Sequence, residues 1–151
     1  MSFNYGAGNG DRVKKASKLC LYYCILVSLA TWILIELFPG FFVRLFTDDE
    51  SMVKIAVSCT SLYFSGYVFM AFQNAGQRTF TSLGHSGFAT FFAIFRKVVI
   101  QIPFALVLPY FMGIAGVMIS EPLSNIIGGL VCYFTMKLVV GKELDRKEVL
   151  V

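Results

Sequence analysis

The sequence has few charged side chains. Asp, Glu, Lys and Arg make up 15% of its 151 residues, against about 25% in an average soluble domain. Hydrophobic residues make up 57% and the mean hydropathy is +0.72. A soluble domain of this size cannot hide so much apolar surface from water. The composition therefore excludes a disordered chain, a disulfide-rich secreted domain and most soluble enzymes, and it indicates a membrane protein.

The residue patterns of catalytic and metal sites are also missing. The sequence contains one histidine and four cysteines, and it shows no nucleophile–base pair, metal quartet or carboxylate dyad. Cys20 and Cys24 are four residues apart, but no histidine or carboxylate lies near enough in sequence to complete a metal site. Gly6, Gly8 and Gly10 neither follow a strand nor precede a Lys-Ser/Thr pair, which predicts a flexible turn rather than a phosphate loop. We expect neither an enzyme nor a bound cofactor or metal.

Two further classes are disfavoured by the distribution of charge. The net charge is +4, but no basic cluster is interleaved with exposed aromatic residues, so we expect no nucleic-acid partner. The first 18 residues are polar and basic and show no secretory signal. We therefore expect the chain to insert into a bilayer by its own spanning helices.

Four segments are long and apolar enough to span a bilayer, which takes roughly 20 residues. The sequence thus predicts an all-α membrane protein with four transmembrane helices. The third helix is the least regular, because it contains Arg96 and Lys97. The expected order is a cytoplasmic loop segment (1–18), a helix (19–38), an external loop (39–51), a helix (52–76), a cytoplasmic loop (77–86), a helix (87–111), an external turn (112–113), a helix (114–138) and a cytoplasmic tail (139–151).

The distribution of Lys and Arg predicts the orientation. If the four spans alternate, nine of these residues fall on the side of the two termini, and only Arg44 and Lys54 fall on the other side. Cytoplasmic loops carry an excess of Lys and Arg. We therefore expect a multi-pass protein of the cell membrane with both termini in the cytoplasm.

Ionisable residues inside the third span are the first candidates for function. Arg96 and Lys97 lie about 14–15 Å along the helix from its expected cytoplasmic start. A cation at this depth is costly when it faces lipid, so it should snorkel, face a wet cavity or meet a partner. Lys97 and Gln101 lie one turn apart, and we expect Lys97 to pair with a carboxylate from another helix.

The fourth span carries a polar stripe. Glu121, Asn125, Gly128 and Cys132 recur along one helical face, flanked by Ser124. This pattern suits either the wall of a cavity or a tight seam between helices, and the sequence leaves both interpretations open. A carboxylate within lipid would be paired or protonated, which favours a functional role.

Polar residues in the second span allow two interpretations. Gln73 and Asn74 lie near its cytoplasmic end, where they either line a vestibule or cap the helix at the interface. His85 follows in a short polar loop, and we expect it to be solvated. Small and hydroxylated residues earlier in this span predict close helix packing.

Several segments resemble the MATE (multidrug and toxic compound extrusion) transporters. Asn4, Tyr5, Gly6 and Ala7, with Arg12 downstream, are similar to a loop in the C-terminal lobe of that family. The stretches LFPGFFVRLFTDDE and FRKVVIQIPFALVLPYFMGIAGVMISEPLSN resemble the segments that follow it. The resemblance extends to about residue 138 and implies helices nine to twelve of a twelve-helix transporter. Such proteins have two six-helix lobes that rock around a central cavity.

The resemblance also implies an activity and a set of partners. MATE transporters export mostly cationic, amphipathic drugs or toxins in exchange for Na⁺ or H⁺. Since eight helices and the N-terminal lobe are lacking, we expect the sequence to be a fragment whose partners are the lipid bilayer and the missing N-terminal transmembrane helices. Asn125 stands where many relatives place an aspartate. Our candidates for the substrate or ion pathway are Glu121, Ser124, Asn125, Gln101, Arg96, Gln73 and Asn74.

Two alternative functions remain open at this stage. A lipid-linked oligosaccharide flippase of the same superfamily would favour a cavity rich in Arg and Lys, and Arg96 with Lys97 is a faint indication of one. A four-helix membrane scaffold or accessory subunit would carry no substrate, and it fits the basic N-terminal segment and the small-residue stripe equally well.

Overall fold

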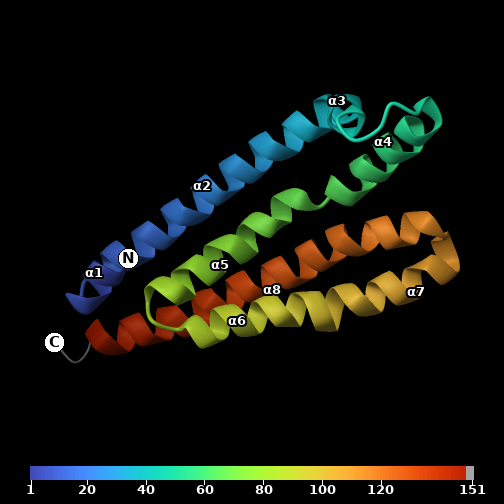
Figure 1. Ribbon diagram of the computed structural model, residues 1–151. Helices are drawn as coiled ribbons and strands as arrows, with labels where there is room; N and C mark the ends of the chain where they lie inside the picture. The colour runs from blue at the N-terminus through green and yellow to red at the C-terminus, as the bar shows by residue number, and fades with distance from the viewer. Residues whose placement is uncertain (149–151) are drawn as a thin grey trace.

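The computed structural model describes the backbone of residues 1–148 and the side chains of residues 1–144. It is helical almost throughout (Figure 1). The end of the expected tail, 149–151, and the side chains of its basic residues Arg146 and Lys147 lie outside this description. The elements are α1 (Ser2–Gly6), α2 (Gly10–Leu37), α3 (Pro39–Arg44), α4 (Glu50–Phe64), η1 (Tyr67–Phe69), α5 (Met70–Ser82), α6 (Ser86–Ile94), η2 (Phe95–Gln101), α7 (Ile102–Met112) and α8 (Ile114–Glu148).

Four long helical columns form the fold, which confirms the predicted class. The stretches Gly10–Leu37, Glu50–Ser82, Ser86–Met112 and Ile114–Leu144 are each long and apolar enough to cross a membrane. No strand occurs among residues 1–148. The second column is α4, η1 and α5, and the third is α6, η2 and α7 (Figure 1).

Local sequence signals explain where the columns begin and end. Pro39 starts α3 directly after α2, where its missing N–H costs nothing. Asp49 caps α4 by accepting a hydrogen bond from the Ser51 backbone N–H at 2.9 Å. Gly84 and Gly113 adopt φ values of +87° and +59° in the turns that join α5 to α6 and α7 to α8. Such values favour glycine because it lacks a Cβ atom.

The helices extend into segments that we expected to be loops. Residues 1–18 contain α1 and the first turns of α2, and the expected flexible turn is confined to the short break around Gly8. The segment 39–51 contains α3. The tail continues as helix α8 to Glu148. The Lys, Arg and Glu residues at the ends of α2 and α8 are good helix formers, so the hydropathy of a span does not mark the end of its helix.

Helix α8 is the packing centre of the fold, and it lies against α4, α5 and α7 (Figure 1). Glycines permit the closest approaches. A Cβ atom at Gly129 would lie 2.5 Å from the Phe69 carbonyl oxygen, and one at Gly66 would lie 2.6 Å from the Pro122 backbone. Close backbone contact of this kind replaces the hydrophobic drive that helices lack in lipid. The glycines of α8 therefore lie in a tight seam between helices, which is one of the two arrangements that the sequence predicted.

Candidate functional site

The carboxylate of Glu121 is the centre of a polar cluster between the third and fourth columns. The Arg96 Nη1 atom donates to its Oε1 atom at 3.2 Å, and the Lys97 Nζ atom lies 3.3 Å from its Oε2 atom. The Gln101 amide also donates to Oε2. The carboxylate that we expected to pair with Lys97 is therefore Glu121, and Arg96 pairs with the same carboxylate.

The wide helix η2 presents all three donors to α8. It is a seven-residue π-helix that carries Arg96, Lys97 and Gln101. Pro103 lies two residues after the end of η2 and has no N–H to donate to the Val99 carbonyl, so regular α-helical bonding is interrupted by the sequence itself. π-Helical turns of this type frequently occur at functional sites.

Arg96 has a second partner and a prepared space in α8. Its guanidinium also donates to the Asn125 side-chain oxygen, one turn beyond Glu121. A Cβ atom at Gly128 would lie 2.6 Å from Arg96 Cγ, so the glycine at this position leaves room for the arginine stem. The stripe formed by Glu121, Asn125 and Gly128 of α8 therefore accommodates the side chain of Arg96.

The cluster contains two cations and one carboxylate, and they differ in exposure. The side chains of Arg96 and Glu121 are 7% and 8% exposed, whereas that of Lys97 is 51% exposed. A buried ion pair tolerates the loss of water only when hydrogen bonds satisfy its remaining atoms. Glu121 meets this condition through three donors, and Lys97 connects the cluster to the outside of the helix bundle.

Part of the hydrogen-bonding capacity of this region is unused. Among the described residues, the buried atoms Arg96 Nε and Gln73 Oε1 have no hydrogen-bond partner. Buried polar groups in folded proteins are nearly always paired. Arg96 therefore holds one unused donor beside its bonds to Glu121 and Asn125.

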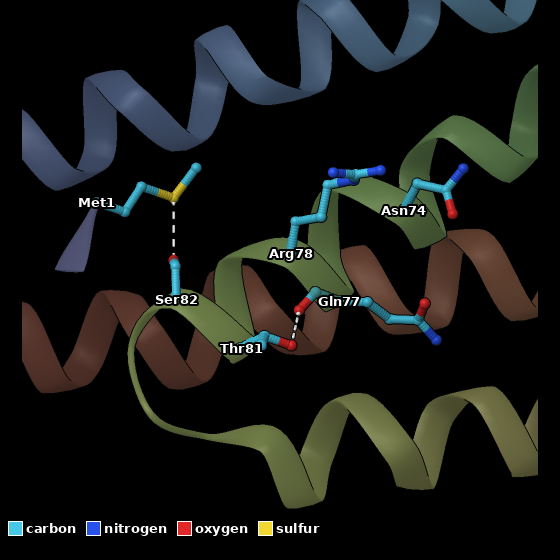
Figure 2. A pocket seen from close by; sticks show the side chains of 6 residues that line it. All are labelled: Met1, Asn74, Gln77, Arg78, Thr81 and Ser82. Atoms are coloured by element: carbon cyan, nitrogen blue, oxygen red, sulfur yellow. Dashed lines mark hydrogen bonds between the residues drawn. The ribbon is translucent and has the colours of Figure 1, made fainter.

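The remaining pathway candidates separate into packing and surface positions. Ser124 is fully buried and donates to the carbonyl of Glu121 in its own helix at 2.9 Å. Gln73 is also buried, and its amide lies 3.5 Å from the Phe92 carbonyl oxygen. Asn74 instead borders an open hollow of about 620 Å³ with Gln77 and Arg78 (Figure 2). Five of the seven candidates thus meet around Glu121, and the two from α5 do not.

The N-terminal motif meets the far end of α8. The Tyr5 hydroxyl donates to one carboxylate oxygen of Glu143, and His85 Nε2 lies 2.7 Å from the other. Our expectation that His85 is solvated was wrong, because α8 continues past residue 138 and brings a carboxylate to it. No sequence signal pairs positions 58 residues apart. Asn4, Gly6, Ala7 and Arg12 surround this contact in sequence, and Asn4 accepts a backbone hydrogen bond from Asn9 at 2.9 Å.

Comparison with known proteins identifies the family. The MatE family model matches residues 1–107, more than half of the chain. An FAD transporter of Shewanella oneidensis is 24% identical over 138 residues, which cover 87% of this chain and 29% of that protein. The chain therefore spans about a third of the length of the relatives it matches.

Solved structures of similar fold belong to the same group. An inward-facing multidrug resistance MATE transporter of the MOP superfamily matches with a TM-score of 0.89 and 22% identity, over 96% of this chain and 34% of that one. An outward-facing structure of such a transporter gives 0.87, with 20% identity over 96% and 33%. Vibrio cholerae VcmN in its bent form gives 0.80, with 17% identity over 97% and 32%. With four membrane-spanning columns and a family match over most of its length, this chain belongs to the MatE family of membrane transporters.

Proposed function

We propose that this chain forms the C-terminal part of a cell-membrane antiporter that exports amphipathic, mostly cationic compounds in exchange for Na⁺ or H⁺. Both termini face the cytoplasm, and the chain supplies helices nine to twelve of a twelve-helix transporter. The observation that carries the proposal is the buried carboxylate of Glu121, held by the two cations Arg96 and Lys97. Ionisable groups inside a membrane are costly and are retained mainly for function.

Exchange of cations at Glu121 is the proposed coupling step. An incoming Na⁺ or H⁺ neutralises the carboxylate and releases Lys97, the more exposed of its two cationic partners. Arg96 keeps its contact with Asn125, so α8 and η2 remain joined while the charge distribution between them changes. An ion that binds one arrangement better than the other shifts the population between two conformations. The substrate cavity requires the helices that this chain does not include.

Similarity to both inward- and outward-facing transporters supports a unit that moves as a body. The two matches differ little in TM-score, 0.89 against 0.87. In alternating access of this type, rigid groups of helices rock against each other around a fixed site. A seam of close glycine contacts in α8 is well suited to such a unit.

The proposal is tested by Glu121→Gln in the full-length protein, because glutamine keeps the shape of the side chain and one acceptor oxygen but removes the charge. We expect efflux of a cationic dye from cells to fall by about tenfold or more while the amount of protein in the membrane is unchanged. The matched control is Glu36→Gln, which removes an exposed carboxylate at the end of α2. Equal efflux by the wild type and Glu121→Gln would show that the charge of Glu121 is not needed for transport.

The same variant separates transport from a scaffold role. A four-helix scaffold or accessory subunit predicts that Glu121→Gln changes assembly or abundance only. Normal abundance together with altered efflux contradicts that alternative.

A second candidate function is export of an anionic, phosphate-bearing cofactor. The relative from Shewanella oneidensis is an FAD transporter, and the cluster here contains one more cation than carboxylates. Uptake of FAD and of a cationic dye into inside-out vesicles distinguishes the candidates. Uptake of FAD alone would replace the cationic substrate class by an anionic one, and a lipid-linked oligosaccharide would also belong to that class.

A further inference from the structure

Two cysteines of α2 line a second hollow, which lies between α2 and α5 and is separate from the Glu121 cluster. Cys20 and Cys24 are four residues apart, which places both on one face of the helix. Both line this open hollow of about 410 Å³, and their thiols interact with each other. Both are free thiols. The hollow therefore presents two thiols side by side.

The exposure of this pair differs from that of a cysteine that serves packing. Cys132 of α8 is 0% exposed, and its thiol lies 3.9 Å from the Gln73 carbonyl oxygen. Cys20 and Cys24 are half-buried instead, in the wall of the hollow. Their sulfur atoms are thus accessible to a ligand that enters it.

The remaining lining favours an uncharged ligand with an apolar part. Tyr23, Val27 and Tyr67 supply aromatic and aliphatic surface. No Asp, Glu or His is among the described residues that line the hollow, so a hard metal ion finds no carboxylate there. Arg78 of α5 extends on the side of α2 (Figure 2), and its charge acts on Cys24. A free metal cation would be repelled by this guanidinium.

The geometry points to a binding site for a trivalent organoarsenical, an uncharged compound that takes two thiols at once. Its arsenic atom bonds to Sγ of Cys20 and to Sγ of Cys24, and its organic group lies against the aromatic side of the hollow. With an aryl arsine oxide, two As–S bonds form and the As=O bond breaks. The oxygen leaves as water with the two thiol protons, and nothing is oxidised or reduced.

The spacing of the pair is what makes the site selective. Once one sulfur has bonded, the second bond forms within the same molecule, so the pair binds far more tightly than one cysteine alone. The pair lies in the first turns of the span expected at 19–38, on the side proposed to be cytoplasmic, where thiols are kept reduced. The inference goes beyond the proposed transport function, because binding here requires neither ion exchange nor efflux.

The test is intact-mass spectrometry of the full-length protein in detergent, reduced and then treated with phenylarsine oxide without oxygen. We expect Cys20→Ser and Cys24→Ser each to bind one phenylarsine oxide fewer than the wild type. The dissociation constant at this site should rise on the order of a hundredfold or more when either thiol is removed. Dimercaptopropanol should remove the adduct, whereas mercaptoethanol at the same thiol concentration should not.

The matched control is Cys59→Ser, which removes a half-buried single cysteine from α4. We expect it to bind as much phenylarsine oxide as the wild type. Labelling of Cys20 by a maleimide in Cys24→Ser reports whether the hollow is open in the folded protein, and we expect labelling in the absence of arsenical.

Three outcomes would overturn this proposal. An unchanged number of adducts in either serine variant of the pair would place the adduct elsewhere. Removal by mercaptoethanol as readily as by dimercaptopropanol would mean that only one thiol holds the arsenic. Failure of the maleimide to label Cys20 in Cys24→Ser would show that another part of the full-length polypeptide covers the hollow.

Discussion

Helices α2 and α8 are similar in hydropathy but differ in how much of each is buried. Their most apolar stretches have mean hydropathies of 1.9 and 1.6, yet 6% of the residues in that stretch of α2 are buried, against 39% in α8. Large apolar side chains such as Val27 and Leu34 of α2 are exposed on the surface of the bundle. The buried residues of α8 instead include many small and polar ones, among them Ser124, Asn125 and Gly129.

This difference shows that the hydropathy of a spanning helix does not report how much of it is buried against the other described helices. In a bilayer the tails are as apolar as leucine, so large aliphatic residues gain little by leaving them. Helices associate where small residues permit close packing and where polar groups find partners. The more polar of these two spanning helices is therefore the one that organises the fold.

The largest effect should come from breaking the buried ion pair of α8. We expect Glu121→Leu to lower the free energy of unfolding by about 3–5 kcal/mol, because it leaves the Arg96 charge buried without a carboxylate. The control is Glu50→Leu at the exposed pair with Arg44, whose side chains are 53% and 66% exposed, and it should cost only about 0–1 kcal/mol. Chemical unfolding of the full-length protein in micelles measures both. Equal losses would contradict the distinction between buried and exposed pairs.

Truncating one apolar side chain in each helix comes next. Met136 in α8 is 2% exposed and packs in a core with Val13 and Phe80, so Met136→Ala should cost about 2–5 kcal/mol through the cavity it leaves. Leu34 in α2 is 51% exposed, and Leu34→Ala should change stability by less than about 0.5 kcal/mol. Unfolding midpoints of the two variants provide the comparison. A cost for Leu34→Ala as large as that for Met136→Ala would mean that the surface of α2 is covered by protein rather than lipid.

Adding a single methyl group to the glycine seam should have an intermediate effect. Gly129→Ala places a Cβ atom 2.5 Å from the Phe69 carbonyl oxygen and should cost about 1–3 kcal/mol, since the backbones must separate. Gly141→Ala in the same helix meets nothing within 4 Å and should leave the melting temperature unchanged or slightly raised. If the two variants have the same melting temperature, the close approach of α8 to η1 does not contribute to stability.

The smallest effect should appear at the start of α4. Hydrogen bonds from Ser51 hold the pKa of the Asp49 carboxyl below its usual value of 3.8. A lowered folded-state pKa means that the charged cap stabilises the helix above pH 3.8 and that this contribution is lost as the pH falls through the lower folded value. We expect amide protection in the first turn of α4 to decrease in this acid range. In the variant Asp49→Asn the side-chain amide caps the helix without titrating, so protection should not change there.

Much of the fold was predictable because it depends on local properties. Runs of about 20 apolar residues predict spanning helices wherever they occur, and Pro39 and Gly113 mark two of the breaks through their own backbone geometry. The helix ends were less predictable. Residues 10–18 and 139–148 continue their helices in polar sequence, where membrane hydropathy carries no information.

The site was predictable as a set of residues but not as a set of contacts. Arg96 and Glu121 were candidates because charges inside a membrane are expensive, and Lys97 was expected to have a carboxylate partner. The identity of that partner depends on the wide turn of η2, which determines the side of the third column that faces α8. The contact of His85 with Glu143 had no sequence signal of any kind.

The sequence alone determined that the chain spans a membrane four times and which of its side chains are too costly to face lipid. Both properties follow from the transfer of individual residues between water and hydrocarbon, and they need no knowledge of neighbours. Only the tertiary structure decided that α8 is the packing centre and that Arg96, Lys97 and Gln101 meet at Glu121. These contacts depend on the rotation and close approach of helices, which are properties of pairs of helices and not of any one segment.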